Sequence, residues 1–295
     1  MAGGRAIVQT ALRSVIEPIF EKDFAEHSYG FRPGRGCQDA LRRVDKLLKK
    51  GRTWVVDADL KSYFDTIPPR RRKGQAGVGG RASHDRLMKL VENKIADGRV
   101  LELICGYLKQ GVMDAHSQSE AGERGTPQGA VISPLLANIY LDPLDQNMAI
   151  SGYEMVRYAD DFIILCHTQE EALAALAAVQ QWTAEVGLTL HPEKTRLVDV
   201  TQPGGFDFLG YRFERGKKTP GKKSLKKFQE TIRSMTKRTS GPSMKAIISD
   251  LKPKMRGWFE SFKHSRSWVF KKLDGWIRLA RPPASLFPSS SSAGD

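Results

Sequence analysis

Residues 155–165 read MVRYADDFIIL, two short apolar runs with a polar break between them. The runs Met155–Tyr158 and Phe162–Leu165 are predicted to be β-strands, so Asp160 and Asp161 lie at or near the tip of a hairpin. Two adjacent carboxylates repel each other and give the fold no obvious stability. A divalent cation explains both, because Mg²⁺ binds carboxylate oxygens and is commonly shared with substrate phosphates. For an acidic pair taken alone, a solvated turn is the plain alternative.

A second acidic motif precedes the hairpin in the chain. Residues 54–65 read WVVDADLKSYFD. Thr53–Ala58 suits a buried strand, and Asp59 falls where that strand ends. A strand-end carboxylate facing a hairpin carboxylate is the arrangement that phosphoryl transfer with two metal ions, about 4 Å apart, requires. Between the two motifs, residues 125–134 read GTPQGAVISP, a turn-rich loop that leads into the apolar stretch Leu135–Leu141.

Six motifs follow one another in the order seen in the reverse transcriptases of bacterial group II introns, and the chain resembles that family from about Arg5 to about Arg281. They are SYGFRPGR (residues 28–35), DLK (59–61), TPQG (126–129), YADD (158–161), HPEKT (191–195) and FDFLGY (206–211). Any one of them could arise by chance, but six in the correct order could hardly do so. The resemblance implies an α+β fold. Its parts are a right-hand palm, made of an antiparallel sheet with helices on one face, partial fingers, and an α-helical thumb.

The same resemblance implies roles for individual residues. Asp59 and Asp160 look like ligands of two Mg²⁺ ions, with Asp161 completing the acidic cluster. Lys194 resembles the lysine that protonates the pyrophosphate leaving group. The other implied site residues are Phe64 under the incoming sugar, Gln128 in the nucleotide and template pocket, Arg32 at the substrate, and Phe208, Leu209 and Gly210 as the grip on the primer end. Ordinary core packing for Phe64 and a solvated turn for Lys194 are the alternatives. The implied partners are dNTPs, an RNA template with a DNA primer, and group II intron RNA.

Positive charge is concentrated toward the C-terminus. The 295 residues have a formal net charge of +14, and residues 216–281 hold 19 Lys and Arg against 4 Asp and Glu. Residues 1–215 are therefore close to neutral, and the basic segment suits a surface that neutralises a phosphate backbone. A soluble basic domain without a nucleic-acid partner is the alternative. The residues predicted to contact RNA phosphates are Lys217, Lys218, Lys222, Lys223, Lys226 and Lys227.

Apolar residues recur at three- and four-residue spacings in residues 257–262 and 268–277, which predicts amphipathic helices. This region resembles the maturase-specific domain of the same intron proteins. The chain is thus expected to have a palm with partial fingers (1–215), a basic helical maturase-specific or thumb domain (216–281) and a disordered tail (282–295). Within the first part, residues 69–83 are basic, rich in glycine and without periodicity, so we expect a flexible insertion there.

Local patterns predict one helix of the palm in more detail. Thr168 and Glu171 make a capping box for a helix over Glu170–Val186, which ends at Gly187. The residues expected on its buried side are Leu173, Leu176, Val179, Trp182 and Val186. Leu188–Leu190 is then expected to return as a strand.

Other signals limit the possible functions. Cys37, Cys105 and Cys166 are scattered, so neither a zinc site nor a disulfide framework is indicated. A signal peptide and a membrane-spanning run are not evident, which makes a cytoplasmic location and no membrane partner the default expectation.

Three functions stay open: an RNA-directed DNA polymerase, an RNA-binding maturase that does not synthesise DNA, and an inert fragment. The acidic motifs favour the first, and the basic segment fits the first two. The N-terminal fingers segment of the resembling family has no counterpart before Arg5, which favours the last two. A truncated or degenerate gene, or a mis-assigned start, would account for this departure.

Overall fold

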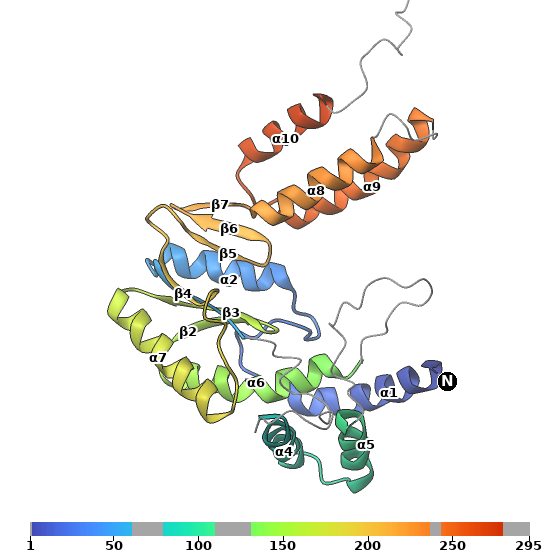
Figure 1. Cartoon of the computed structure of the whole chain (residues 1–295), viewed down its shortest axis with the longest axis vertical. Helices are drawn as coiled ribbons and strands as arrows, with labels where there is room; N and C mark the ends of the chain where they lie inside the picture. Colours follow the sequence, from blue (N-terminus) through green and yellow to red (C-terminus); the bar gives the residue numbers. More distant parts are fainter. Residues whose placement is uncertain (1, 61–78, 110–130, 237–242, 280–295) are drawn as a thin grey trace, which may run out of the picture. The chain divides into compact units, whose positions relative to one another are not determined.

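The computed structural model describes residues 2–60, 79–109, 131–236 and 243–279, and the chain divides into two compact units, Met1–Asp199 and Val200–Asp295 (Figure 1). The first unit contains α1 (Ala2–Glu21), α2 (Cys37–Lys49), β1 (Trp54–Asp59), α4 (Gly79–Glu92), α5 (Gly98–Lys109), α6 (Ser133–Ile150), β2 (Glu154–Tyr158), β3 (Asp161–Cys166), α7 (Gln169–Glu185) and β4 (Arg196–Asp199). The second contains β5 (Phe206–Phe208), β6 (Tyr211–Glu214), β7 (Lys217–Pro220), α8 (Lys222–Met235), α9 (Met244–Phe262) and α10 (Ser267–Leu279). Within the described ranges, the helices are too short or too polar to cross a membrane.

A four-stranded antiparallel sheet in the order β2-β3-β1-β4 forms the centre of the first unit. Strands β2 and β3 make the predicted hairpin, with Ala159 and Asp160 as the turn, and β1 ends at Asp59 as predicted. Successive side chains of a strand point to opposite faces of the sheet. On one face Val56 and Phe162 belong to the main hydrophobic core, together with residues of helices α6 and α7.

Helix α2 packs on the opposite face of the same sheet, along β2 and β3 (Figure 1). Arg43 of α2 forms an ion pair with Glu154 of β2. Val156 points to the same face as Glu154 and is fully buried. The predicted α+β class, a reverse-transcriptase palm followed by a helical region, is confirmed. The sequence did not predict that α2 covers the second face of the sheet.

Helix α7 has the predicted cap, because the Thr168 hydroxyl accepts a hydrogen bond from the backbone N–H of Glu171 at 3.1 Å. The other half of the predicted capping box differs, because the Glu171 carboxylate accepts from the backbone N–H of His167 at 2.8 Å and not from that of Thr168. The prediction of its buried side was wrong at Leu173, which is 52% exposed. The small residues Ala172 and Ala175 face the sheet instead, and they are fully buried. Alanines let a helix approach a sheet closely, so the largest apolar side chain of the first turns is not the one that packs.

The segment after α7 also differs from the prediction. Leu188–Leu190 is not a strand, because only Leu190 bridges to Leu60 in an isolated pair. The strand that completes the sheet is β4, which pairs with β1 from Arg196 onward. The loop between them carries the HPEKT motif, and the backbone N–H of His191 donates to the Asp59 carbonyl at 2.8 Å. This bond fixes the loop to the end of β1.

Helix α4 begins at Gly79, so the prediction of a flexible insertion was wrong for residues 79–83. Leu87 and Val91 of α4 are fully buried four residues apart, so the helix packs on the core through this side. Residues 69–78 lie outside the described ranges, as does the predicted tail at 282–295.

The second unit pairs a small sheet, β5-β6-β7, with three helices. Tyr211 of β6 donates a hydrogen bond from its hydroxyl to the Ser261 carbonyl at 2.7 Å, and its ring centroid lies 5.0 Å from that of Phe262. Tyr211 of β6 therefore packs against α9, so the small sheet belongs with the helices. The second unit begins at Val200 and not after Arg215, where the basic segment begins. The amphipathic helices predicted within residues 257–262 and 268–277 are present as parts of α9 and α10.

Candidate active site

Three polar side chains lie in one row across the palm sheet. Tyr158 of β2 is the register partner of Asp161 of β3, and Asp161 is the partner of Asp59 at the end of β1. Directly opposed residues of an antiparallel pair have Cβ atoms about 5 Å apart, and like charges at such positions are destabilising. Asp160 occupies the adjoining turn. The fold therefore gathers the predicted acidic residues, and the register places Asp161, not Asp160, directly opposite Asp59.

Lys194 completes this group from the loop between α7 and β4. Its Nζ donates a hydrogen bond to Asp59 Oδ2, although the two residues are far apart in the sequence. This bond raises the pKa of Lys194 above its ordinary value, and the charges of Asp160 and Asp161 add to the effect. The Lys194 side chain is therefore an ammonium group, with its positive charge beside the carboxylates. Over the described part of the chain, no three His, Cys, Asp or Glu side chains converge in the arrangement of a metal centre.

Asp161 is a carboxylate of this site whose negative charge is disfavoured by its surroundings. The pKa of Asp161 is raised from 3.8 to about 7: burial is the largest cause, the nearby charges of Asp57, Asp160 and Asp59 act in the same direction, and Lys194 opposes them. A carboxylate that is surrounded by other carboxylates is stabilised by a positive charge brought among them. The donor set consists of hard carboxylate oxygens, which are the ligands that Mg²⁺ prefers. The chemistry of this donor set thus suits a divalent cation, and a bound ion would have to draw the carboxylates together, since no three of them converge within the described residues.

We expect Asp161→Asn to stabilise the metal-free protein, and to do so more strongly at higher pH. The folded-state pKa of Asp161 lies above its unfolded value, so the folded form binds the extra proton and stability falls as pH rises toward about 7. The amide removes this loss, so the variant should gain on the order of 1 kcal/mol relative to the unmodified chain between about pH 5 and about pH 8. Scanning calorimetry in the presence of a chelator measures the gain. An equal difference at both pH values would contradict the assignment, and Glu102→Gln, at an exposed position of α5, is the control.

Arg32 was expected at the substrate, and its surroundings correct that expectation. Its side chain is 2% exposed and forms an ion pair with Glu21 of α1 at 2.8 Å. Its guanidinium also donates to the carbonyls of Ala25 at 2.6 Å and Ser28 at 2.8 Å. These bonds engage the donors inside the protein, so Arg32 shapes the loop of residues 25–32 and does not face a substrate.

Two charged groups of the palm were not singled out from the sequence. Asp57 points to the same face of β1 as Asp59 and forms an ion pair with Arg196 of β4 at 2.9 Å. Arg157 of β2 is 1% exposed and pairs with Asp145 of α6. A charged residue inside a predicted buried strand was the available signal for Arg157, because such a residue requires a buried partner.

The predicted primer grip forms the tight turn between β5 and β6 in the second unit. Leu209 and Gly210 both have positive φ, +48° and +81°, as a two-residue type I′ hairpin requires. The Gly210 carbonyl accepts hydrogen bonds from the Gly221 N–H at 2.8 Å and from the Ser224 hydroxyl at 3.2 Å. Phe208 is buried, so only the turn itself is accessible.

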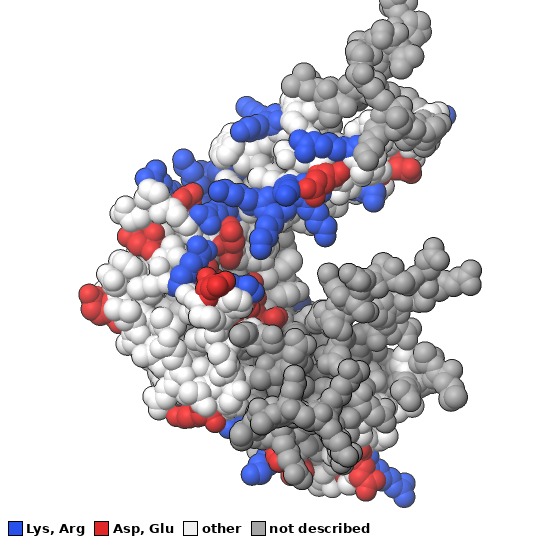
Figure 2. All heavy atoms as spheres, in the orientation of Figure 1, with Lys and Arg blue, Asp and Glu red and all other residues white. Residues whose placement is uncertain are grey.

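Helix α8, next to this turn, presents a lysine face. Lys222, Lys223, Lys226 and Lys227 are exposed, while Phe228 is buried in the core of the unit. On the face drawn in Figure 2, Lys and Arg gather over β7 and the first turns of α8. Lys217 of β7 is exposed too, but Lys218 is half-buried, with its Nζ 5.4 Å from the centroid of the Tyr211 ring. Of the other expected site residues, Phe64 and Gln128 lie outside the described ranges.

Comparisons with known proteins agree with this geometry. The model of the family "Reverse transcriptase (RNA-dependent DNA polymerase)" matches residues 5–213, and that of the "Group II intron, maturase-specific domain" matches residues 225–280. Protein YkfC of Escherichia coli is 34% identical over 248 residues, which are 71% of this chain and 60% of that protein. The group II intron-encoded protein LtrA of Lactococcus lactis is 37% identical over 140 residues, 48% of this chain and 20% of that protein.

The chain therefore covers less than two thirds of the length of these relatives. Among solved structures, telomerase from Candida albicans aligns with 95% of this chain and 51% of its own, at 12% identity and a TM-score of 0.46, which is too low to support an argument. The family assignment rests on the match over residues 5–213, which contains the whole row of acidic residues. The chain belongs to the reverse transcriptase family, and its C-terminal match to the maturase-specific domain identifies it as a protein of the group II intron type.

Proposed function

We propose that this chain extends a DNA primer on an RNA template, with two Mg²⁺ ions held by Asp59, Asp160 and Asp161. The observation that supports this most is the alignment of Asp161 with Asp59 across β3 and β1, beside Lys194. Opposed carboxylates destabilise a sheet, so their presence favours a functional reason for the arrangement. When bound, the ions would activate the primer hydroxyl and neutralise the charge that develops on the transferred phosphoryl group.

The chain's own groups have separate parts in this proposal. The carboxylates of Asp59, Asp160 and Asp161 would hold the ions. Lys194 is bonded to Asp59. If Asp59 shared its charge with a bound ion, the Lys194 ammonium would be able to turn to the pyrophosphate oxygen and donate its proton there. Phe64 below the sugar and Gln128 beside the template base stay predictions.

We expect Lys194→Gln to lower the rate of nucleotide addition by about a hundredfold, because a positioned general acid contributes roughly 10²- to 10⁴-fold. Binding of the primer and template should be nearly unchanged, since the side chain is 61% exposed and packs little. Single-turnover primer extension separates the two effects. The matched control is Lys94→Gln. It removes a lysine that forms an ion pair with Asp23, and both residues are distant in the sequence from the acidic row. Equal rates for Lys194→Gln and the unmodified chain would exclude the acid role.

Primer extension with dNTPs, Mg²⁺ and an RNA template is the direct test of the proposed function. Extension that requires the RNA template and is abolished by a chelator would support it. A second candidate, an RNA-binding maturase without synthesis, is favoured by the lysine face of α8 and by the match at residues 225–280. Binding of group II intron RNA with no extension would favour this second function, and the absence of both activities would favour an inert fragment.

A further inference from the structure

The guanidinium of Arg157 is buried beneath the acidic hairpin, and it serves more than one partner. Its Nε donates to both carboxylate oxygens of Asp145, at 2.7 and 2.9 Å. The exposed fractions of the two side chains are 1% and 3%. A fully buried ion pair loses hydration that its attraction only partly replaces, so apolar residues of similar volume are often at least as stable. Stability alone therefore does not explain why a buried arginine occupies position 157.

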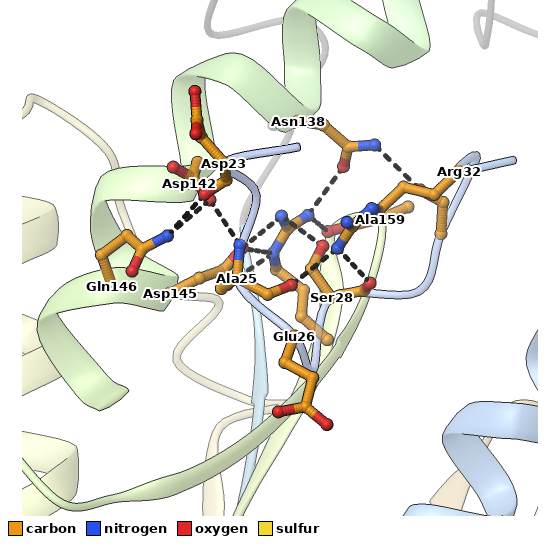
Figure 3. Close-up of polar contacts among 12 residues, drawn as sticks. Asp23, Ala25, Glu26, Ser28, Arg32, Asn138, Asp142, Asp145, Gln146 and Ala159 are labelled. Atoms are coloured by element: carbon orange, nitrogen blue, oxygen red, sulfur yellow. Dashed lines mark hydrogen bonds and ion pairs between the residues drawn. The ribbon is translucent and has the colours of Figure 1, made fainter. Parts of the chain in front are cut away.

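The remaining donors of Arg157 connect three separate segments. Its Nη1 donates to the Asn138 side-chain oxygen at 3.0 Å and to the Ala159 carbonyl at 2.8 Å, and Nη2 donates to the Ser28 hydroxyl at 2.8 Å. Figure 3 shows Asn138, Asp145, Ser28 and Ala159 gathered in one place, from α6, the loop before α2 and the hairpin turn. Ala159 is the residue immediately before Asp160. Arg157 thus holds the Ala159 carbonyl in the turn that follows its own strand.

The other side of the turn is fixed by Gly30. A Cβ on Gly30 would lie 2.3 Å from the Ala159 backbone nitrogen and 2.9 Å from the Tyr158 carbonyl carbon, so only glycine allows this approach. The Asn138 side-chain nitrogen donates to the Gly30 carbonyl at 2.8 Å, which links Gly30 to the same asparagine that binds Arg157. Ala159 has φ of +60°, a conformation that is unfavourable for a residue with a side chain. The contacts on both sides hold it there.

We propose that Arg157, Asn138 and Gly30 are positioning residues, which hold the Ala159–Asp160 turn so that the hairpin carboxylates face Asp59. This proposal rests on the proposed function, because it gives the acidic row its metal-binding geometry. A shift of the turn would move Asp160, and with it Asp161 at the start of β3, while the rest of β2 and β3 stays paired. The expected loss is therefore in metal affinity and rate, more than in stability.

The first test is Gly30→Ala, with Gly36→Ala as the matched control. A Cβ on Gly36 meets only a side-chain oxygen at 3.9 Å, so the control adds a methyl group to the same loop without touching the hairpin. Terbium luminescence excited through the neighbouring Tyr158 reports metal binding without primer or nucleotide, and Asp161→Asn identifies the part of the signal that belongs to the acidic row. We expect Gly30→Ala to weaken Tb³⁺ binding by about 10- to 100-fold, as is usual when outer partners of a metal ligand are changed. Gly36→Ala should bind Tb³⁺ like the unmodified chain.

The second test separates positioning from stability. The double variant Arg157→Met with Asp145→Leu removes the buried ion pair together with its hydration penalty, so its melting temperature should fall less than that of Arg157→Met alone, which leaves the Asp145 carboxylate buried without its partner. Part of the loss remains in both variants, because Asn138, Ala159 and Ser28 lose a hydrogen-bond donor. Tb³⁺ affinity should still fall by about tenfold or more, because the Ala159 carbonyl has lost its donor. Unchanged Tb³⁺ affinity in both this variant and Gly30→Ala would overturn the proposal, and so would affinity losses that only follow the fraction of unfolded protein.

The two proposals can fail independently. If the unmodified chain binds Tb³⁺ at the acidic row but does not extend a primer, the proposed polymerase function fails, and the luminescence of the variants still decides the positioning role. If the unmodified chain extends primers and Gly30→Ala does so at the same rate with the same Tb³⁺ affinity, the positioning role fails and the polymerase function stands.

Discussion

Asp59→Asn is expected to reduce primer extension by at least about a thousandfold while RNA binding stays intact. A metal ion supplies several kcal/mol of transition-state stabilisation, and each 1.4 kcal/mol is about a tenfold change in rate. Asp59 ends β1 at the position opposite Asp161, so the amide removes one of the ligands that the ions share. The substitution keeps the size of the side chain and its place in the sheet. The same reasoning applies to Asp160→Ala in the hairpin turn.

Two measurements make this prediction specific. Single-turnover extension gives the rate, and equilibrium binding of labelled RNA gives the affinity of the same preparation. Glu102→Gln makes the same change of charge on the exposed side of α5 and should leave both values unchanged. Extension by Asp59→Asn within about tenfold of the unmodified rate would refute the metal-ligand assignment.

Neutralising the lysine face of α8 is expected to give the largest loss of RNA affinity. Lys222, Lys223, Lys226 and Lys227 share one side of the helix, because Lys222 and Lys226, Lys223 and Lys227, and Lys223 and Lys226 are three or four positions apart and so are neighbours on the helical surface. If each contacts one phosphate of a single-stranded RNA, replacing all four with glutamine lowers the slope of log affinity against log salt concentration by about 3. Lys226 Nζ also lies 3.9 Å from Glu230 Oε1, and this exposed ion pair adds little to the stability of the fold. The fold should therefore survive.

The matched control removes four positive charges from α2 and its C-cap, at the exposed positions Arg42, Lys46, Lys49 and Lys50. Titration of RNA at several salt concentrations gives the slope for each variant. A decrease that is confined to the α8 variant would place the phosphate contacts on that helix. Equal decreases in both variants would mean that only the net charge matters, and an unchanged slope in the α8 variant would move the binding surface elsewhere.

The sequence was sufficient to predict the parts of the palm that depend on local pattern. The hairpin around Asp160, the strand that ends at Asp59 and the Thr168 cap each depend on residues within a few positions of one another. Lys194 was assigned through its motif, and the structure brings it to Asp59. The predictions of the hairpin, of the strand end and of the cap are confirmed, because short-range propensity and the resemblance point to the same residues. The role of Lys194 stays a prediction.

What could not be predicted depends on contacts between distant segments. Arg32 belongs to a motif that suggested a substrate contact, yet its partners are Glu21 and two carbonyls of its own loop. Arg157 lies within a predicted strand, and its partner Asp145 is on α6. At Leu173, hydrophobicity suggested burial, but the close approach of the alanines in α7 leaves the leucine exposed. Charge showed where the basic segment begins, whereas the packing of Tyr211 on α9 sets the start of the second unit.

The bonds from Gly221 and Ser224 to the Gly210 carbonyl join the β5–β6 turn to the first turn of α8. They restrict how far the turn and the lysine face can move relative to each other. If a nucleic-acid strand binds both surfaces, the protein and not the base sequence would set the number of nucleotides between the two contacts.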